Sequence, residues 1–311
     1  MALVAAEVVL RCLWLSNDRY HLWPPNFTTT LVLKPEVMPG VGRIARLRIN
    51  SRGIRGPEWS FDRSQEYRIL AVGGSTTECL NLDQDRTWSA LLQSSLGSTG
   101  DNRNVWVGNL GKAGLNSRDH LGLMRLAIDQ YDIDLIVMLI GGNDMIHRLL
   151  QDSSYDPFFI MDEGRYLAWL SDRFAIVPSS REGSLFKGAA LRRIASRSKL
   201  IAKSIIEDEG GWLMKVRALR QQASVVDELP PLGSGVSEFE RNVQLIVEEA
   251  HRRALRIVLL TQPTMWKPDT LDYERNLLWM GWRPDVVFTR REHSPELWTV
   301  RTNACSRRVT A

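Results

Sequence analysis

The feature that most constrains the fold is a series of short apolar runs, each followed by a glycine-rich turn. The first run, from Tyr67 to Val72, is followed by Gly-Gly, and the third, from Leu135 to Ile140, by Gly-Gly-Asn-Asp. A six-residue apolar run is typical of a strand that is buried on both faces of a sheet. Because residues at helical spacing separate the runs, the pattern predicts an α/β fold with a parallel sheet, right-handed crossovers and helices on both faces.

Four strands and three helices are predicted in this alternating pattern. The strands are expected from Tyr67 to Val72, Asn104 to Asn109, Leu135 to Ile140 and Arg256 to Thr261. The helices are expected from Thr87 to Leu96, Asn116 to Tyr131 and Glu238 to Ala254. Asn116 or Ser117 offers a side-chain oxygen that could cap the second of these helices.

A long insertion separates the third strand from the fourth. Arg256 follows Asn143 by 113 positions, far more than one helical crossover needs. We therefore predict a helical insertion at about 146–236, either a cap over the site or a surface extension. Its basic stretch from Leu191 to Ile206 has helical character. The chain is divided into residues 1–66, an N-terminal helix with a Pro- and Gly-rich surface lead-in, and residues 67–311, the α/β domain.

The charge and the cysteines exclude several classes of protein. The 311 residues contain 40 Lys and Arg against 36 Asp and Glu, and no long basic run, so no nucleic-acid partner is predicted. The three cysteines, Cys12, Cys79 and Cys305, are widely spaced and odd in number. They provide neither a disulfide framework nor a CxxC zinc site. We predict no metal and no cofactor.

The first 15 residues are apolar but carry Glu7 and Arg11. This stretch is shorter than the roughly 20 residues that cross a bilayer, and it lacks the basic start and the cleavage site of a signal peptide. It is interpreted as an amphipathic or partly buried helix. Membrane association through this N-terminus, as the remnant of a longer anchor, stays open. The compartment is therefore not assigned, and both a cytoplasmic and a cell-envelope location are compatible with the sequence.

The chemistry of the chain is expected where the strands end. In open parallel sheets, ligands bind beyond the carboxyl ends of the strands. Three turns follow the first three predicted strands, at Gly73 to Glu78, Asn109 to Gly114 and Gly141 to Asp144. We expect all three to open onto one crevice, although each of them could also serve only to end its strand.

Ser75 is the candidate nucleophile in this crevice. It directly follows a strand and begins a predicted helix, where free amides favour negative charge nearby. Acyl transfer also needs hydrogen-bond donors for the oxyanion, each worth about 3–4 kcal/mol of barrier. The backbone amides of Ser75 and Gly114 and the side-chain amide of Asn143 are the candidate donors. Asp144 and Glu78, beside the crevice, are expected to be structural hydrogen-bonding groups.

The order of the three turns resembles a known family. Gly-Gly-Ser-Thr-Thr, Asn-Leu-Gly-Lys-Ala-Gly and Gly-Gly-Asn-Asp are similar to the first three blocks of the SGNH hydrolases, also called GDSL esterases and lipases, over Tyr67 to Met145. The segment from Arg256 to Trp266 resembles the family's fourth strand and the loop after it. The resemblance implies a three-layer α/β/α sandwich of the SGNH/flavodoxin type. It also implies catalytic roles for three residues, Ser75 as nucleophile with Gly114 and Asn143 as oxyanion donors.

The C-terminal part departs from the family pattern. The family's general base is a His three residues after an Asp, close to the C-terminus, and no such pair lies there in this chain. The two Asp-x-x-His pairs, Asp18 with His21 and Asp144 with His147, lie elsewhere, and His293 lacks the Asp. Because few residues follow His293, we expect the fifth strand to be missing and the chain to be truncated or frame-shifted. Which His, if any, serves as the base stays open.

Two functions are compatible with these features. The first is an SGNH-type serine ester hydrolase that acts on a small-molecule, carbohydrate or lipid acyl ester, impaired if the last block is missing, because serine without a base is a poor nucleophile. The second is a catalytically inactive relic or a protein that binds a carbohydrate or acyl ligand. Tryptophans that could stack on a sugar, or simply pack, are Trp169, Trp212, Trp266, Trp279 and Trp282. Nucleotide binding is disfavoured because no GxGxxG follows the first strand.

Overall fold

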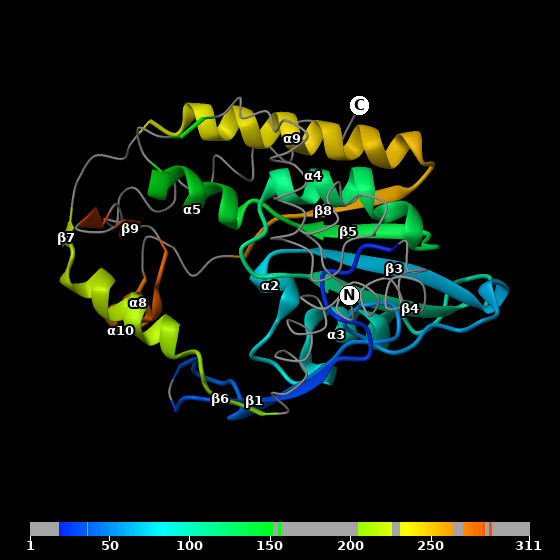
Figure 1. Cartoon of the computed structure of the whole chain (residues 1–311), viewed down its shortest axis with the longest axis horizontal. Helices are drawn as coiled ribbons and strands as arrows, with labels where there is room; N and C mark the ends of the chain where they lie inside the picture. The colour runs from blue at the N-terminus through cyan, green and yellow to red at the C-terminus, as the bar shows by residue number, and fades with distance from the viewer. Residues whose placement is uncertain are drawn as a thin grey trace, which may run out of the picture.

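The centre of the protein is a four-stranded parallel sheet. A computed structural model of the chain describes residues 19–35, 37–151, 155–156, 205–225, 231–263, 270–280, 282–283 and 286–287. The strands of the sheet lie in the order β4-β3-β5-β8 (Figure 1). Their bounds are Glu66–Gly73 for β3, Asn104–Gly111 for β4, Leu135–Leu139 for β5 and Arg256–Leu260 for β8. All four predicted strands are confirmed, each within two residues at either end.

The register of this sheet brings the strand ends to one edge. β3 pairs in parallel with both β4 and β5, and Gly73 at its end lies opposite Gly111 and Leu139. β5 pairs in parallel with β8, with Leu139 opposite Leu260. Every residue of β3 is buried, as expected for a strand with neighbours on both sides and helices on both faces. The carboxyl ends of all four strands therefore meet at the same edge.

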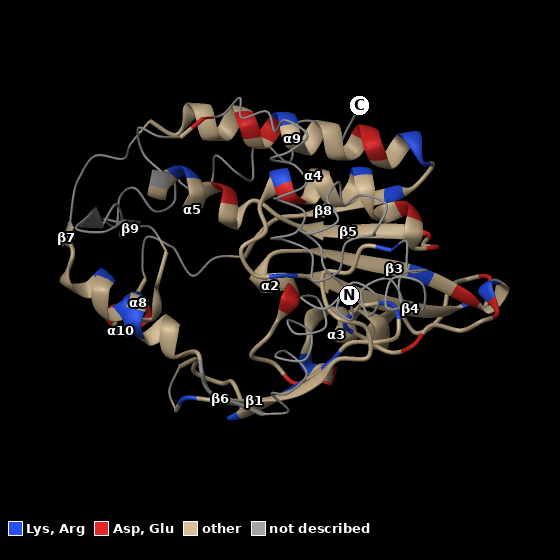
Figure 2. Cartoon of the chain, viewed as in Figure 1, with Lys and Arg blue, Asp and Glu red and all other residues tan. Residues whose placement is uncertain are grey.

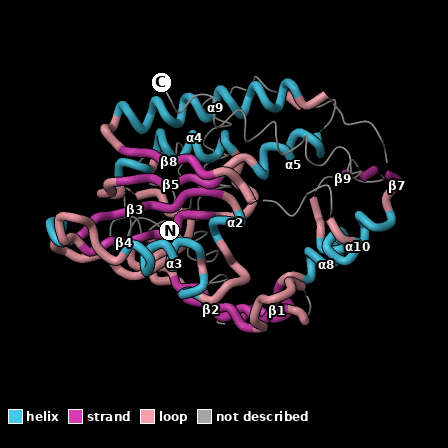
Figure 3. Tube along the Cα trace, turned by 180° about the vertical axis from the view of Figure 1, so that it is seen from behind, coloured by secondary structure: helices cyan, strands magenta, loops and turns pink. Residues whose placement is uncertain are grey.

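Helices cover the two faces of the sheet, which confirms the α/β/α arrangement. On one face, α4 (Ser117–Leu126) and α9 (Gly233–Arg252) pack against the sheet and each other, and Met124 and Ile246 join the same core as Met138. On the other face, α3 (Trp88–Leu96) packs its Leu92 against a core that contains Val107. Figures 1 and 3 show α9 and α4 on one side of the strands and α3 on the other.

The starts and ends of these helices follow local sequence signals. Asn116 caps α4, because its side chain accepts from the amides of Arg118 and Asp119, and the Asp119 carboxylate accepts from the Asn116 amide. This reciprocal pair satisfies amides that have no partner inside the helix. α4 ends at Leu126, before the predicted end, and a 3-10 turn, η3 (Ile128–Gln130), follows it.

The predicted surface lead-in forms part of a second core. β1 (Thr28–Leu33) and β2 (Ile44–Arg48) form an antiparallel pair, and β6 (Ile205–Glu209) joins β1 in parallel. Leu31 and Leu47 are each only 1% exposed, so the interpretation as a surface segment is wrong. The expectation of helix through Ile206 is also wrong at its end. Pairing with β1, which is far away in the sequence, favours a strand there, and Ile has a high strand propensity.

The outer strand of the parallel sheet differs from the inner ones. β8 is the edge of the sheet among the described residues, and Val258 and Leu260 are 43% and 37% exposed. The predicted absence of a fifth strand concerns the chain beyond residue 287, which lies outside the described residues. The predicted helix of the first 15 residues also lies outside them. Both therefore stay predictions.

The remaining elements are short, and most lie beside the end of the sheet where the strands stop. They are α2 (Ser75–Glu78), α5 (Gly142–Gln151), α8 (Gly211–Gln222), α10 (Asp272–Leu277), η1 (Arg63–Gln65), η2 (Gln84–Arg86), β7 (Ser224–Val225), β9 (Trp282–Arg283) and β10 (Val286–Val287). Acidic and basic residues both occur along α4 and α9 (Figure 2). Within the described ranges, no helix combines the length and apolar character needed to span a bilayer.

Candidate active site

The ends of the parallel strands enclose a small pocket, called here the Ser75 pocket. Segments after β3, β4, β5 and β8 all contribute to it, as expected for the carboxyl edge of a parallel sheet. Part of the chain after α10 closes it from another side. The lining residues are Gly74, Ser75, Thr76, Leu115, Leu139, Ile140, Gly141, Gly142, Asn143, Gln262, Trp279 and Met280.

Ser75 is the first residue of α2 and is exposed at the wall of this pocket. Gly74 precedes it, and a Cβ at Gly74 would lie 2.8 Å from Nδ2 of Asn143. Real Cβ atoms do not approach a neighbour that closely, so glycine at this position allows Asn143 to sit beside the serine. The turn from β3 into α2 thus places Ser75 and Asn143 in the lining of the same pocket.

Asn143 is the second residue of α5 and is held by the loop after β4. Its Nδ2 donates a hydrogen bond of 2.7 Å to the carbonyl oxygen of Leu115. A side-chain amide nitrogen carries two N–H groups, so the second remains for an oxygen in the pocket. Gly141 allows this start of α5, because its φ of +104° belongs to the region that other residues rarely adopt.

Gly114 lies beside the pocket but is not among its lining residues. It is exposed, and its φ of +83° again favours glycine. The next residue, Leu115, does line the pocket and accepts the hydrogen bond from Asn143. The structure therefore brings Ser75 and Asn143 together directly, and it places Gly114 one residue away from the lining. The oxyanion roles of these residues stay predictions.

Arg55 binds the end of α2 and the turn after it, and no sequence pattern pointed to this role. The side chain is 2% exposed and donates to the carbonyl oxygens of Glu78, Cys79 and Leu82 at 2.6, 2.8 and 2.7 Å. Its backbone exchanges two hydrogen bonds with Asn109 of β4. Burial lowers the pKa of the Arg55 guanidinium. Its only sequence signal is that an Arg precedes the Gly-Pro turn at position 56.

Two carboxylates beside the pocket tie its loops together, in line with their expected structural role. The Glu78 carboxylate accepts from the amide of Ala113 at 3.0 Å, which links the end of α2 to the loop after β4. The Asp144 carboxylate accepts from the amide of Ser117 at 3.0 and 3.1 Å, which links α5 to the start of α4. Each carboxylate satisfies a backbone amide next to a loop that carries a candidate site residue.

None of the candidate bases is among the described residues that line the Ser75 pocket. The ring of His21 is buried, with Nδ1 3.1 Å from the carbonyl oxygen of Arg52, and its partner in the motif, Asp18, is outside the described residues. His147 lies on α5 and packs its ring edgewise against Tyr155, with the ring centroids 6.0 Å apart. Neither lines the pocket. His293 is outside the described residues.

His120 and His251 are no closer to the required position. His120, on α4, is fully buried, and burial lowers its pKa to about 3, so its ring is neutral at physiological pH. Its two ring nitrogens have no hydrogen-bond partner in the described part of the chain. His251 is exposed near the end of α9. Among the described histidines, none lines the pocket.

The β8 side of the pocket contributes side chains without acid–base function. Gln262, after β8, donates from Nε2 to the hydroxyl of Thr76 at 3.3 Å. Trp279 and Met280 line the pocket, and Trp279 packs edgewise against Trp212 with ring centroids 5.4 Å apart. Of the tryptophans singled out in the sequence, two therefore form a pair. Trp169 and Trp266 lie outside the described residues, and the backbone of Trp282 belongs to β9.

No metal site accompanies this pocket in the described part of the chain. There, no group of three or more His, Cys, Asp or Glu residues could hold a metal ion. The described cysteine, Cys79, is a free thiol that points to the carbonyl oxygen of Thr76 at 3.1 Å, and burial raises its pKa. It follows α2 and does not line the pocket.

Comparison with known proteins identifies solved structures of the family that the sequence resembles. No protein-family model matches the chain, and no curated protein matches it significantly. Similar solved structures include AlinE4, an SGNH-hydrolase family esterase, at 15% identity, covering 79% of this chain and 98% of that chain, with a TM-score of 0.30. TesA matches at 15% identity, covering 77% and 98%, with a TM-score of 0.27.

Axe2, an acetylxylan esterase from Geobacillus stearothermophilus, matches at 15% identity, covering 79% of this chain and 94% of that chain, with a TM-score of 0.28. The predicted likeness to SGNH esterases is thus found among solved structures. At these identities and TM-scores the likeness says nothing about activity. Any functional conclusion has to come from the residues of the Ser75 pocket.

Proposed function

We propose that the chain is a serine ester hydrolase of the SGNH type, with Ser75 as the nucleophile. The observation that carries the proposal is the exposure of Ser75 next to the side-chain amide of Asn143, at the edge where parallel strands end. A hydroxyl that can meet a substrate and a donor with a spare N–H are two of the three parts that acyl transfer needs. The third part is a base.

In the proposed reaction, the hydroxyl oxygen of Ser75 attacks the carbonyl carbon of an ester and loses its proton to a base. The negative charge that develops on the carbonyl oxygen is stabilised by N–H groups of Asn143, of the Ser75 backbone and of Gly114. The alcohol leaves with a proton, and water then releases the acid from the acyl-serine. The substrate is a small-molecule, carbohydrate or lipid acyl ester, and Trp279 and Met280 provide apolar surface beside its reacting carbon.

A second function is favoured by one observation, the absence of a described histidine from the pocket lining. With Ser75 and the donors but no base, hydrolysis would fall to the residual level of about 10³–10⁴ over water that binding and oxyanion stabilisation supply. The chain would then bind an acyl or carbohydrate ligand, with Trp279 as part of the binding surface, and turn it over very slowly. Activity and binding must therefore be measured separately.

Covalent labelling tests the nucleophile directly. A fluorophosphonate that carries a fluorescent tag reacts with serines whose oxygen is activated beside an oxyanion site. We expect one adduct per chain, on the peptide that contains Ser75, and no adduct in Ser75→Ala. The matched control is Ser64→Ala, because Ser64 is also exposed at the first turn of a short helix.

The outcomes separate the two functions. Labelling of Ser75 that Ser64→Ala retains supports the hydrolase. An unlabelled protein that still binds a short-chain ester, as detected by quenching of tryptophan fluorescence, supports ligand binding without turnover. An adduct on a different serine would contradict the assignment of Ser75.

A further inference from the structure

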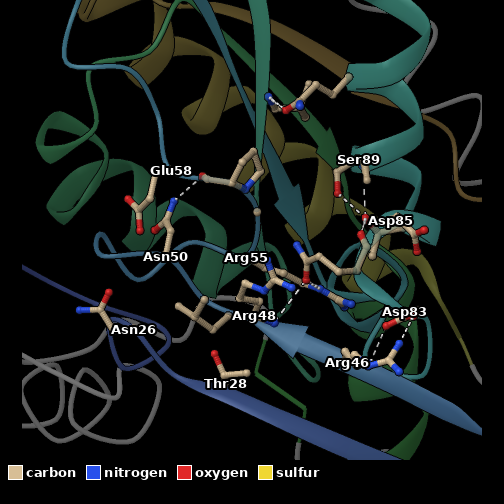
Figure 4. A pocket seen from close by; sticks show the side chains of 18 residues that line it. Asn26, Thr28, Arg46, Arg48, Asn50, Arg55, Glu58, Asp83, Asp85 and Ser89 are labelled. Carbon is tan, nitrogen blue, oxygen red and sulfur yellow. Dashed lines mark hydrogen bonds and ion pairs between the residues drawn. The ribbon is translucent and has the colours of Figure 1, made fainter.

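A large polar groove, which shares no lining residue with the Ser75 pocket, has a volume of about 810 Å³. This size falls in the range of small-ligand sites, which is roughly 300–1,000 Å³. The hairpin of β1 and β2 forms one wall, and η2 with the first part of α3 forms the other (Figure 4). We call it the Arg48 groove, after a side chain near its middle. Nothing in the proposed hydrolysis uses it.

Two guanidinium groups in this groove have no carboxylate partner. Arg48 is exposed on β2, and its side chain forms no ion pair or hydrogen bond with any described residue. Arg55 is buried, and its hydrogen bonds go to backbone carbonyls and to Gln84, with no carboxylate within ion-pair distance among the described residues. A buried charge in a protein is normally paired. The carboxylates of Glu78 and Asp83 act on Arg55 only from beyond ion-pair distance, so among the described residues no direct ion pair neutralises the two guanidinium groups.

Two side-chain amides add hydrogen-bond donors. The oxygen of Gln84 accepts from the backbone amide of Arg48 and from Arg55, at 3.3 and 3.2 Å. The oxygen of Gln93 accepts from the backbone amide of Val107 at 2.8 Å. Because both oxygens are engaged, the NH₂ ends of these amides are the ends left to donate to a ligand.

The acidic residues of the groove lie to either side of the two arginines. In Figure 4, Glu58 lies on one side of Arg48 and Arg55, and Asp83 and Asp85 lie on the other. The Glu58 carboxylate accepts from the amide and hydroxyl of Ser51, both at 2.7 Å. Asp83 is paired with Arg46 at 3.0 Å. Asp85 is exposed. Two of the three carboxylates are thus already engaged, and neither is engaged with Arg48 or Arg55.

We propose that the Arg48 groove binds the anionic group of a small polar ligand, a carboxylate or a phosphate. Arg48 makes the direct contact, the amides of Gln84 and Gln93 donate beside it, and Arg55 supplies fixed positive charge from the floor. Anion oxygens accept from guanidinium groups in short, charge-assisted hydrogen bonds. The site is separate from Ser75, so it stands whether or not the chain hydrolyses esters.

Isothermal titration calorimetry with the full chain tests this site with three probes. Glucuronate and inorganic phosphate represent the two sources of an anionic group, and glucose is the neutral match for glucuronate. The test variant is Arg48→Gln, which removes the charge from an exposed side chain. The control is Arg43→Gln, because Arg43 is exposed just before β2 but does not line the groove.

We expect saturable binding of glucuronate or phosphate that is at least about tenfold tighter than any binding of glucose. Arg48→Gln should weaken it about tenfold, the loss expected for one charge-assisted hydrogen bond, and Arg43→Gln should change it less than twofold. Ser75→Ala should bind like the unmodified chain. Which probe binds identifies the anion. Three results would overturn the proposal: no binding of either anion, equal binding of glucose, or undiminished affinity in Arg48→Gln.

Discussion

The two sides of the Ser75 pocket are built very differently. On one side, β3 and β5 are buried strands of the core, and Ser75 and Asn143 follow them directly, with Nδ2 of Asn143 bonded to the loop after β4. On the other side, β8 is the edge of the described sheet, and only Gln262 follows it into the pocket. The side with Ser75 and Asn143, the proposed nucleophile and oxyanion donor, therefore follows buried strands, whereas the β8 side follows the edge of the described sheet.

The proposed mechanism needs two things of the pocket: hydrogen-bond donors that stabilise the transition state, and a base that activates the serine. Donors that are already in place need no reorganisation when charge develops, so they act at full strength. A base must in addition lie within hydrogen-bond reach of the serine hydroxyl. Under the proposed mechanism, the described residues of the pocket supply the electrostatic part of catalysis, and no described histidine of the lining supplies the acid–base part.

Apart from loss of the nucleophile itself, the largest expected effect comes from removing the Asn143 amide. Asn143→Ala should lower kcat for ester hydrolysis by about 10²–10³, with little change in KM, because the donor acts mainly on the charge that develops during the reaction. Steady-state kinetics on a chromogenic ester would measure both constants. Gln262→Ala is the matched change on the β8 side and should cost less than tenfold. Equal losses of kcat in Asn143→Ala and Gln262→Ala would contradict the proposal that only the Asn143 side stabilises the developing charge.

The buried His120 makes the stability of the core depend on pH. The pKa of His120 is lowered to about 3 in the folded protein, whereas an unfolded His titrates near 6.5. Below about pH 6.5 the unfolded chain takes up a proton that the folded chain cannot. The free energy of unfolding should therefore fall toward acid pH, by at most about 1.4 kcal/mol per pH unit, while above pH 6.5 this histidine contributes no pH dependence.

Urea unfolding between pH 7.5 and 5 measures that dependence. His120→Leu should reduce the loss of stability at low pH, because the residue that takes up the proton in the unfolded chain is gone. His251→Leu, at an exposed position on α9, is the control and should leave the slope unchanged. The same slope in His120→Leu as in the unmodified chain would show that His120 is not the source.

A smaller effect is expected from the carboxylate that links α5 to α4. Asp144→Ala leaves the amide of Ser117 without its acceptor, and loss of such a cap costs about 1 kcal/mol. Thermal unfolding should show a lower Tm, together with a several-fold lower kcat, because Asn143 is the neighbouring residue. A lower Tm with unchanged kcat would mean that the donor is held without this link.

The smallest effects are expected from the two described histidines in Asp-x-x-His pairs. Neither His21 nor His147 lines the pocket, so His147→Ala and His21→Ala should each keep kcat within about twofold. The readout is the pH–rate profile of each variant beside that of the unmodified chain. Loss of activity in His147→Ala, with an unchanged Tm, would assign His147 as the base and would place the base on α5, on the side of Ser75 and Asn143 rather than on the β8 side.

Local sequence signals predicted the parallel sheet and its turns. The apolar runs from Tyr67 and Leu135 could only be stable with cover on both faces, and the glycines after them indicated where the strands end. Convergence of Ser75 and Asn143 at one edge follows from parallel pairing alone. These features needed no knowledge of contacts between distant segments.

The features that were missed depend on distant contacts. β1 pairs with β6, which lies about 170 residues later in the sequence, and no pattern in either strand indicates which strand it pairs with. Arg55 donates to backbone carbonyl oxygens at the end of α2. Because every residue has a carbonyl oxygen, the sequence does not indicate which residues Arg55 contacts. Trp279 lines the pocket because the segment after α10 lies beside the strand ends, a contact that no local pattern marks. The position of a base was open from the sequence for the same reason.

The most direct test of the proposed function is hydrolysis of a chromogenic short-chain acetate ester by the purified chain and by Ser75→Ala at the same protein concentration. Equal Tm values for the two proteins would establish that both are folded. If Ser75 is the nucleophile, saturable hydrolysis by the unmodified chain should disappear in the variant, and Ser64→Ala should retain it. Equal rates for the chain and for Ser75→Ala would contradict the assignment and would leave the pocket as a ligand-binding site.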